Sequence, residues 1–598
     1  MGALSAVIGD TADAYRMRLF NIAVPQLFGA VGVTLGALVF GHGWVAVGVL
    51  TALALISGMI SSIGAVASVC GLLLLLNATV GAGLPMPGPW WLAPALLTLG
   101  GLLVLLLTLL GWPWRGGVPE RVAVSSVYRE VAALLEAAGT PDYADRRQAV
   151  SASLNHSYDL ILARRTREHG RRGTLVRSLA QLNALIPLLE AAPAVHFQGG
   201  ALPAEIPATV RNLADAIEHG APHTARPPLC PRPATPAARA LDEALHHAAQ
   251  VARDEDPDPY NIDDRLGRPA SLRVRVRRTT RNVLRSGTSW RYGLRLATCI
   301  GLAQCLVSLI DVPRSYWVTL TIVFVMKPDF GSVFSRAVLR AVGTAAGLVV
   351  AAAVLSQIPR GWWDVPVMAV LAALIPFLSQ RGYAYQTAAI TPVILLLSDL
   401  LNRQGFGLIA PRLLDSLIGC GIALVAGYLL WPESWGTRVG DRLAKAVSDT
   451  ADHVALAFPA DARSAADTVA RAHSRRRLYR DLMSVRTEFQ RALTEPPPMG
   501  RRAAAWWPLV IAVERIVDAT TAAHVRVEHG APPPAPSDVA AIAGQLRALS
   551  EGLRGSTTLV SVRADLPGAA SDGAGPDDVL APLRQEVLAA RAIASPRR

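Results

Sequence analysis

The stretches LLGWPW (109–114) and YLLWPESW (428–435) each close a long block of apolar sequence, and the two endings resemble each other. The first block runs over about 19–112 and the second over about 292–431. Long polar segments, rich in arginine and alanine, lie between and after them. This duplicated plan is typical of a multi-span membrane transporter or channel, and it disfavours a soluble enzyme.

The overall composition also points to a membrane protein. Hydrophobic residues make up 52% and charged residues 17% of the 598 positions, and a mean hydropathy of +0.33 is too apolar for an ordinary soluble protein of this length. The formal net charge of +13 raises the alternative of nucleic-acid binding. The arginines border the apolar blocks, however, where cytoplasmic loops carry positive charge, so no nucleic-acid partner is expected.

Motifs of enzymatic chemistry are missing from the sequence. It contains no GxxxxGK[ST] phosphate-binding loop, no HExxH zinc motif and no GxSxG nucleophile elbow. The five cysteines form no CxxC pair and fit no metal-ligand spacing. We therefore expect no enzyme, no cofactor and no metal site.

The apolar blocks divide into spans. A bilayer core about 30 Å thick needs about 20 apolar residues per helix. About four spans are expected in the first block, 19–112, at 19–40, 44–61, 63–83 and 91–112. About six are expected in the second, 289–432, at 292–310, 315–326, 338–356, 364–379, 384–401 and 411–431. The sequence thus predicts an all-α membrane protein with two homologous transmembrane blocks.

The segments outside the blocks predict cytoplasmic helical bundles. Apolar residues recur with helical spacing in 113–288 and in 433–598, and glycine and proline interrupt the pattern between helices. The tail of the second segment is rich in glycine and proline and is expected to be mobile. Residues 1–18 are expected to form a cytoplasmic N-terminal turn.

Arginines next to the span ends set the expected orientation. Arg115 and Arg121 follow the first block, and a dense run of arginines between 265 and 295 leads into the second. By the positive-inside rule both place the middle segment in the cytoplasm. Even numbers of spans then put the N- and C-termini on the same side.

Two stretches of the second block resemble a known family. They are YWVTLTIVFVMKPDFGSVFSRAVLRAVGTAAGLVV (316–350) and RLLDSLIGCGIALVAGYLLWP (412–432). The matching elements are Tyr316-Trp317, Pro328-Asp329, Arg336, Arg340, Gly343-Thr344 with Gly347, Arg412, Asp415 and Gly419. In this order they resemble the fusaric acid resistance (FUSC-like) membrane proteins, which include bacterial exporters of aromatic carboxylic acids. The resemblance implies a bacterial plasma-membrane protein that exports such acids.

The two blocks also resemble each other at their starts, because residues 1–38 are similar to those at about 323–350. The first block would then lack counterparts of the first two spans of the second. Two explanations stay open, a natural shortened variant and a coding sequence whose true start lies upstream. The correspondence pairs Asp10 with Asp329, Gly32 with Gly343 and Gly36 with Gly347.

Charged residues near span ends are the candidate transport residues. Asp415 lies in the first turns of an apolar span, one turn after Arg412, so the two either form a local ion pair or serve transport. Lys327, Asp329, Arg336 and Arg340 are expected in a cytoplasmic turn, where they either attract an organic anion or only mark topology and cap helices. Close helix packing is expected at Gly32, Gly36, Gly343, Gly347 and Gly419, with Thr344 beside them.

Transport of small organic anions, such as aromatic carboxylates, is the function that these features favour. The substrate would pass Lys327, Arg336 and Arg340 into a path between the two blocks, and Asp415 would link transport to protons. The expected partners are the lipid bilayer, the anion and further copies of the chain in a homo-oligomer. Two alternatives remain, a passive anion channel and a non-transporting scaffold whose cytoplasmic bundles bind partners.

Overall fold

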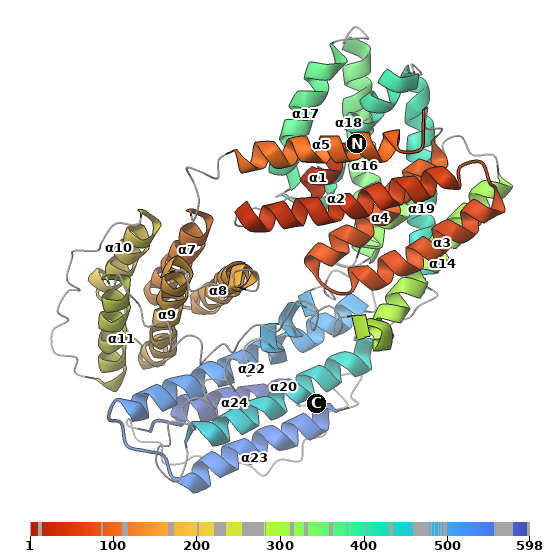
Figure 1. Cartoon of the computed structure of the whole chain (residues 1–598). Helices are drawn as coiled ribbons and strands as arrows, with labels where there is room; N and C mark the ends of the chain where they lie inside the picture. The colour runs from red at the N-terminus through yellow and green to blue at the C-terminus, as the bar shows by residue number, and fades with distance from the viewer. Residues whose placement is uncertain are drawn as a thin grey trace. The chain divides into compact units, whose positions relative to one another are not determined.

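The chain folds into helices that form two compact units (Figure 1). The computed structural model describes residues 2–9, 15–84, 88–110, 118–165, 173–199, 202–219, 235–253, 280–281, 283–310, 316–327, 333–357, 363–379, 381–402, 405–429, 435–458, 478, 481–483, 485–487, 489–490, 493, 499–554 and 578–594. No strand occurs in these ranges, so the predicted all-α class is confirmed. We call 1–112, 270–433 and 494–496 the membrane unit. The helical unit comprises 113–269, 434–493 and 497–598.

The membrane unit contains helices from both apolar blocks. Among the described helices, eight are long and apolar enough to cross a membrane, and seven of these belong to this unit. The first block supplies α1 (Gly2–Gly9), α2 (Tyr15–Leu38), α3 (Trp44–Ser61), α4 (Ala65–Gly83) and α5 (Leu92–Leu109). The second supplies α14 (Gly287–Leu309), α15 (Tyr316–Val325), α16 (Val333–Gln357), α17 (Asp364–Ser379), α18 (Tyr383–Asn402), the 3-10 turn η1 (Gly405–Leu408), α19 (Ile409–Leu424) and the π-helical turn η2 (Val425–Leu429).

Two expectations about these segments are wrong. The ten residues of α15 rise only about 15 Å, half of the hydrocarbon core, so this helix is too short to form the span expected at 315–326. Residues 2–9, expected to lie in a turn, form helix α1, which packs on α2 and α5. The segment GALSAVIG is apolar, and burial against apolar helices stabilises it as a helix.

The helices of the two blocks pack in the same order. In the first block α2 lies against α4 and α5, α3 against α4, and α1 against α5. In the second block α16 lies against α18 and α19, α17 against α18, and α15 against α19. Helix α14 has its main partner in the other block, because it packs along α3 and so joins the blocks.

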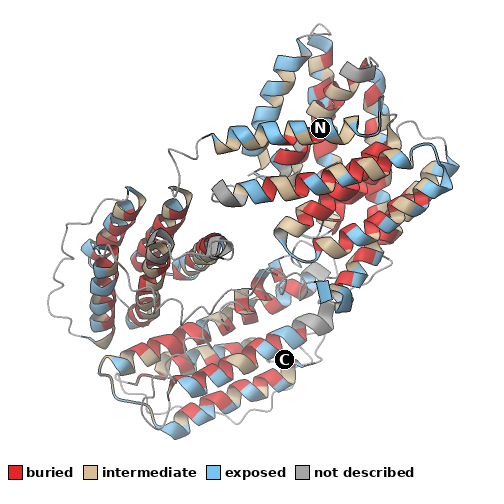
Figure 2. Cartoon of the chain, in the orientation of Figure 1, coloured by how far each residue is buried: buried red, intermediate tan, exposed pale blue. Residues whose placement is uncertain are grey.

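The outer surface of the membrane unit is apolar. Large exposed apolar side chains line α5, including Leu99, Leu103 and Leu107 (Figure 2). Only 11% of the residues of this helix are buried. Among the described residues of the helical unit, the large exposed apolar side chains are Val122, Leu456, Leu493 and Leu588. An apolar surface of this extent requires hydrocarbon around it, so the membrane unit contacts the lipid bilayer.

Two glycines mark the crossing that joins the blocks. A Cβ atom added at Gly58 of α3 would lie 2.7 Å from the Cα atom of Gly293 in α14, closer than real atoms approach. Beside the crossing, the hydroxyls of Ser62 and Ser289 are hydrogen-bonded at 2.8 Å. Lipid tails are as apolar as side chains, so close packing and hydrogen bonds, rather than the hydrophobic effect, hold helices together in a bilayer.

We expect Gly58→Ala to lower the melting temperature of the detergent-solubilised protein by at least about 2 °C, because the added methyl group separates α3 from α14. Thermal unfolding followed by tryptophan fluorescence measures this. The matched control is Gly48→Ala on the same helix, where nothing lies within 4 Å of the added Cβ. Alanine is favoured over glycine inside a helix by about 0.5–1 kcal/mol, so the control should be neutral or stabilising. Equal melting temperatures for the two variants would contradict the role of the crossing.

The helical unit draws its helices from both sides of the second block in sequence. Its core includes α9, which packs against α7, α8, α11 and α22. α9 is also apolar enough to span a membrane. However, 67% of the residues in its apolar 18-residue stretch are buried in this unit, so we interpret it as a core helix. The bounds are α7 (Val118–Glu136), α8 (Tyr143–Arg165), α9 (Gly173–Gln198), α10 (Glu205–His219), α11 (Pro236–Arg253), α20 (Trp435–Ala457), α22 (Met499–Glu528), α23 (Pro536–Leu553) and α24 (Ala581–Ala594).

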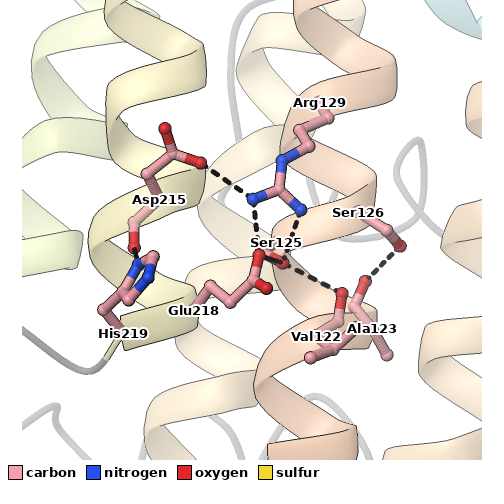
Figure 3. Close-up of polar contacts among 8 residues, drawn as sticks. All are labelled: Val122, Ala123, Ser125, Ser126, Arg129, Asp215, Glu218 and His219. Atoms are coloured by element: carbon pink, nitrogen blue, oxygen red, sulfur yellow. Dashed lines mark hydrogen bonds and ion pairs between the residues drawn. The ribbon is translucent and has the colours of Figure 1, made fainter.

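An exposed ion-pair cluster joins α7 to α10 (Figure 3). Arg129 Nη2 lies 2.8 Å from Asp215 Oδ1 and 2.5 Å from Glu218 Oε2. The hydrogen bond from Arg129 lowers the pKa of Glu218. The pair therefore stabilises the fold above the ordinary glutamate pKa of about 4.3, and this contribution is lost as the pH falls through the lowered value. Because all three side chains are substantially exposed, it is worth no more than about 1 kcal/mol, and buried apolar residues hold the two helices together.

Candidate functional site

Five charged side chains are buried in the described part of the membrane unit. One is Asp399 of α18, whose Oδ1 accepts a hydrogen bond from the backbone N–H of Gly405, and the other four lie on α16 and α19. Arg336 and Arg340 of α16 are 4% and 3% exposed, and Arg412 and Asp415 of α19 are 3% and 1% exposed. The spacing of four residues on α16 and of three on α19 puts each pair on one helix face, and α16 packs on α19. A charge at membrane depth costs about 2.5–3.5 kcal/mol or more, which makes this charged cluster the leading functional candidate.

The short helix α15 covers the cluster with aromatic rings. The guanidinium carbon of Arg412 lies 4.0 Å from the ring centroid of Trp317, and that of Arg340 lies 4.7 Å from the ring centroid of Phe324. A guanidinium group over an aromatic face is attracted by the electron-rich π-system and needs fewer water molecules. The rings thus hold two arginines in place without neutralising them.

Several polar atoms of the cluster lack a partner. Neither carboxylate oxygen of Asp415 accepts a hydrogen bond from the described part of the chain, and Arg412 Nη1 and Arg340 Nε likewise have no acceptor there. The ion pair expected between Arg412 and Asp415 is therefore not formed, although the residues are one turn apart. Unpaired charged atoms in a protein interior require water, an ion or a ligand, or mark a working site.

A stripe of threonines continues the cluster along α16 and α18. Thr344 lies two turns after Arg336 on α16, and its hydroxyl, like that of Thr387 on α18, has no hydrogen-bond partner within the described ranges. Gly343 and Gly347 let α18 approach this face, because added Cβ atoms would lie 2.5 Å and 2.8 Å from the carbonyl oxygens of Ala384 and Ala388. The polar stripe therefore lies between closely packed backbones.

The other candidates are placed as follows. Lys327 is half-buried at the end of α15, and Asp329 lies outside the described residues. Arg336 and Arg340, expected in a cytoplasmic turn, are instead in α16, because the helix begins at Val333. The expected close packing is found at three further glycines. A Cβ atom added at Gly419 would lie 2.8 Å from the carbonyl oxygen of Val318. Cβ atoms added at Gly32 and Gly36 would lie 2.2 Å and 2.1 Å from the carbonyl oxygens of Leu74 and Ala78.

The rings and Thr387 are the site features that the sequence analysis did not assign. Trp317 stood in a recognised motif, but which charge it contacts depends on how α15 packs on α19. No group of three or more metal-ligating side chains occurs among the residues that the structure describes. The cluster therefore offers three guanidinium groups and one carboxylate, a net charge of +2, without a metal ligand set.

We expect Thr344→Cys to react with a charged, membrane-impermeant methanethiosulfonate at least about tenfold faster than Val349→Cys, in a chain whose five native cysteines are replaced by alanine. Thr344 adjoins unpaired charged atoms that require water, whereas Val349 on the same helix is 70% exposed on the apolar outer surface. A thiolate forms in water and not in hydrocarbon, so labelling in proteoliposomes separates the two environments. An unreactive Thr344→Cys would contradict a hydrated cluster.

The part of the chain that carries the charged cluster is similar to known proteins. The family model described as fusaric acid resistance protein-like matches residues 300–426, which include the four charges of the cluster. The chain is 29% identical to the inner membrane protein YccS of Escherichia coli (strain K12) over 161 residues, 27% of this chain and 22% of that protein. It is 25% identical to the uncharacterized membrane protein YvaC of Bacillus subtilis (strain 168) over 436 residues, 70% of this chain and 66% of that protein.

A third similar protein is the uncharacterized protein YhfK of Escherichia coli (strain K12), 31% identical over 140 residues, 23% of this chain and 20% of that protein. The chain thus matches about a fifth of the length of the two Escherichia coli relatives and less than two thirds of the Bacillus subtilis one. No solved structure matches it. With apolar membrane-length helices and a matching domain around the charged cluster, the chain is a multi-pass membrane protein that contains a fusaric acid resistance protein-like domain at residues 300–426.

Proposed function

We propose that this protein is a secondary transporter that exports small organic anions, aromatic carboxylates among them, through the charged cluster of α16 and α19. The observation that carries the proposal is the excess of buried positive charge, with Arg340 Nε and Arg412 Nη1 left without acceptors. A carboxylate is the natural acceptor for guanidinium donors, because its two oxygens match their geometry. The helical unit and both termini are cytoplasmic in this proposal.

The path that we propose runs within the second block. The four charges of the cluster belong to α16 and α19, and the covering rings belong to α15 of the same block. This replaces the earlier expectation of a path between the two blocks. The first block then serves mainly as a support, joined to the second through the contact of α3 with α14.

Asp415 is the proposed proton acceptor. Protonation of its carboxylate would raise the net charge of the cluster from +2 to +3, which favours anion binding. By linkage, a bound anion then favours the proton equally, so anion and proton bind together and move in the same direction. Co-transport of one monovalent anion with one proton moves no net charge, so the membrane potential does not drive it. Export then takes place where the outward anion gradient exceeds the inward proton gradient.

Arg412→Ala is expected to lower the flux of radiolabelled benzoate in proteoliposomes at least about tenfold, because a charge-assisted hydrogen bond to the anion is lost. Arg381→Ala is the matched control, since Arg381 contacts the ring of Phe377 at the exposed turn before α18. Unchanged flux for Arg412→Ala, with both variants folded and incorporated equally, would contradict the proposed path.

Asp415→Asn tests the proton link. We expect benzoate flux to persist while its response to an imposed pH gradient disappears, because asparagine fits the same space but binds no proton. The measurement compares flux with and without the gradient at zero membrane potential in both proteins, and then with an imposed membrane potential and no pH gradient. If the wild-type flux follows voltage and ignores the pH gradient, the protein is a passive anion channel and the role of Asp415 fails.

A further inference from the structure

The helical unit contains a cavity, and none of the candidate transport residues lines it. It has a volume of about 380 Å³ and is lined by α8, α9, α22, α24 and by Leu482, Met483 and Arg486. This volume is within the range of small-molecule pockets, about 300–1,000 Å³. Its walls come from both parts of the helical unit, before and after the second apolar block in sequence.

One side of the cavity is aromatic. The ring of Tyr143 stacks on His196 with centroids 3.9 Å apart and planes 10° apart, and Phe197 meets His196 edge-on at 5.3 Å. The backbone N–H of Gly139 donates to His196 Nδ1 at 3.0 Å, so the ring proton is on Nε2 and the imidazole is neutral. Burial lowers the pKa of His196 and so favours that neutral form; the charge of Asp518 opposes this shift and that of Arg515 adds to it. Leu482, Met483 and Ile511 complete the apolar lining.

Most charges of the opposite wall neutralise each other. Arg486 Nη1 lies 2.6 Å from Glu514 Oε2, and Arg486 Nη2 donates to Gln148 Oε1 at 2.5 Å. Arg147 Nη2 lies 3.3 Å from Asp518 Oδ1. One buried donor is left over, because Arg486 is only 8% exposed and its Nε has no acceptor among the described residues.

One cation and one anion of the lining also remain unmatched. Arg515 and Glu586 both line the cavity and their charges interact, yet within the described ranges they do not form an ion pair with each other. Burial raises the pKa of Glu586, an effect that Arg515 opposes. The remaining charged residue of the lining, Asp145, is exposed. The cavity therefore offers an exposed cation, an extra N–H donor and a half-buried carboxylate beside an apolar wall.

We propose that this cavity binds a small zwitterion, an α-amino acid with an apolar side chain. Its carboxylate accepts hydrogen bonds from Arg515 and from Arg486 Nε, and its ammonium group donates to Glu586. Its side chain packs against Tyr143 and Met483. A plain carboxylate would leave Glu586 facing a second negative charge, and a plain amine would leave Arg515 and Arg486 Nε without an acceptor.

The bound amino acid would connect the two sequence segments of the helical unit. Tyr143 and His196 belong to the segment before the second block, whereas Arg486, Arg515 and Glu586 belong to the segment after it. A ligand that binds only the folded state raises its stability by mass action. The cavity is thus a cytoplasmic sensor site, and it is independent of the substrate proposed for the membrane unit.

The test uses the full chain in detergent and three probes of one shape, L-phenylalanine, phenylacetate and phenethylamine, in isothermal titration calorimetry. We expect L-phenylalanine to bind at least about tenfold more tightly than either analogue, because each analogue lacks one charge. Arg412→Ala should leave this binding unchanged, since Arg412 lies in the membrane unit. Phenylacetate binding as tightly as L-phenylalanine, or no binding of L-phenylalanine, would overturn the proposal.

Variants locate the binding. Arg515→Ala and Glu586→Gln should each weaken L-phenylalanine binding at least about tenfold, whereas phenylacetate should lose affinity only with Arg515→Ala. The matched controls are Arg547→Ala and Glu551→Gln, exposed residues of α23 that do not line the cavity. Met483→Trp fills the cavity without changing charge and should also abolish binding. If the controls weaken binding as much as the cavity variants, the site is elsewhere and the proposal fails.

Discussion

The bilayer's inability to solvate an ion is the constraint on which this structure depends. It favours apolar side chains on the outer surface of the membrane unit. It also makes a charge at membrane depth costly, so that such a charge is kept where it has a function. The faces of Phe324 and Trp317 take the place of part of the water around the guanidinium groups of Arg340 and Arg412, and they leave the charge of these groups intact. The carboxylate of Asp415 accepts no hydrogen bond from the described part of the chain. A cluster built in this way is incomplete without water or an anion.

Close backbone packing supplies the rigidity that the hydrophobic effect cannot provide in lipid. The contacts at Gly58 with α14, and at Gly343 and Gly347 with α18, leave no room for a side chain. The same device sets the geometry of the charged cluster, because Gly419 brings α19 against α15, the helix that carries Trp317. In the helical unit, by contrast, buried leucine, valine and alanine side chains fill the core, as in any water-soluble bundle.

Much of this architecture could be predicted from hydropathy alone. The structure has α3 at Trp44–Ser61, the range that the apolar stretch indicates, since one bilayer thickness fixes one helix length. α17 at Asp364–Ser379 also matches its apolar stretch, although its 16 residues rise only about 24 Å. The cluster was harder to predict. Arg336 and Arg340 follow a turn rich in glycine and proline, and only their spacing from Thr344 hints that they face inward. The positions of the rings of α15 depend on tertiary packing, which no local pattern encodes.

The split of the helical unit in the sequence has a consequence for biosynthesis. α9 packs on α22, yet about 300 residues, including the whole second block, separate the end of one helix from the start of the other. At about 5–20 residues per second, the ribosome needs some 15–60 s to make that intervening stretch. During this interval, the side chains of α9 that pack on α22 in the folded protein lack that partner, while the second block enters the bilayer. The helical unit can therefore close only after the second block has been synthesised, which leaves the nascent protein open to binding by a holding chaperone.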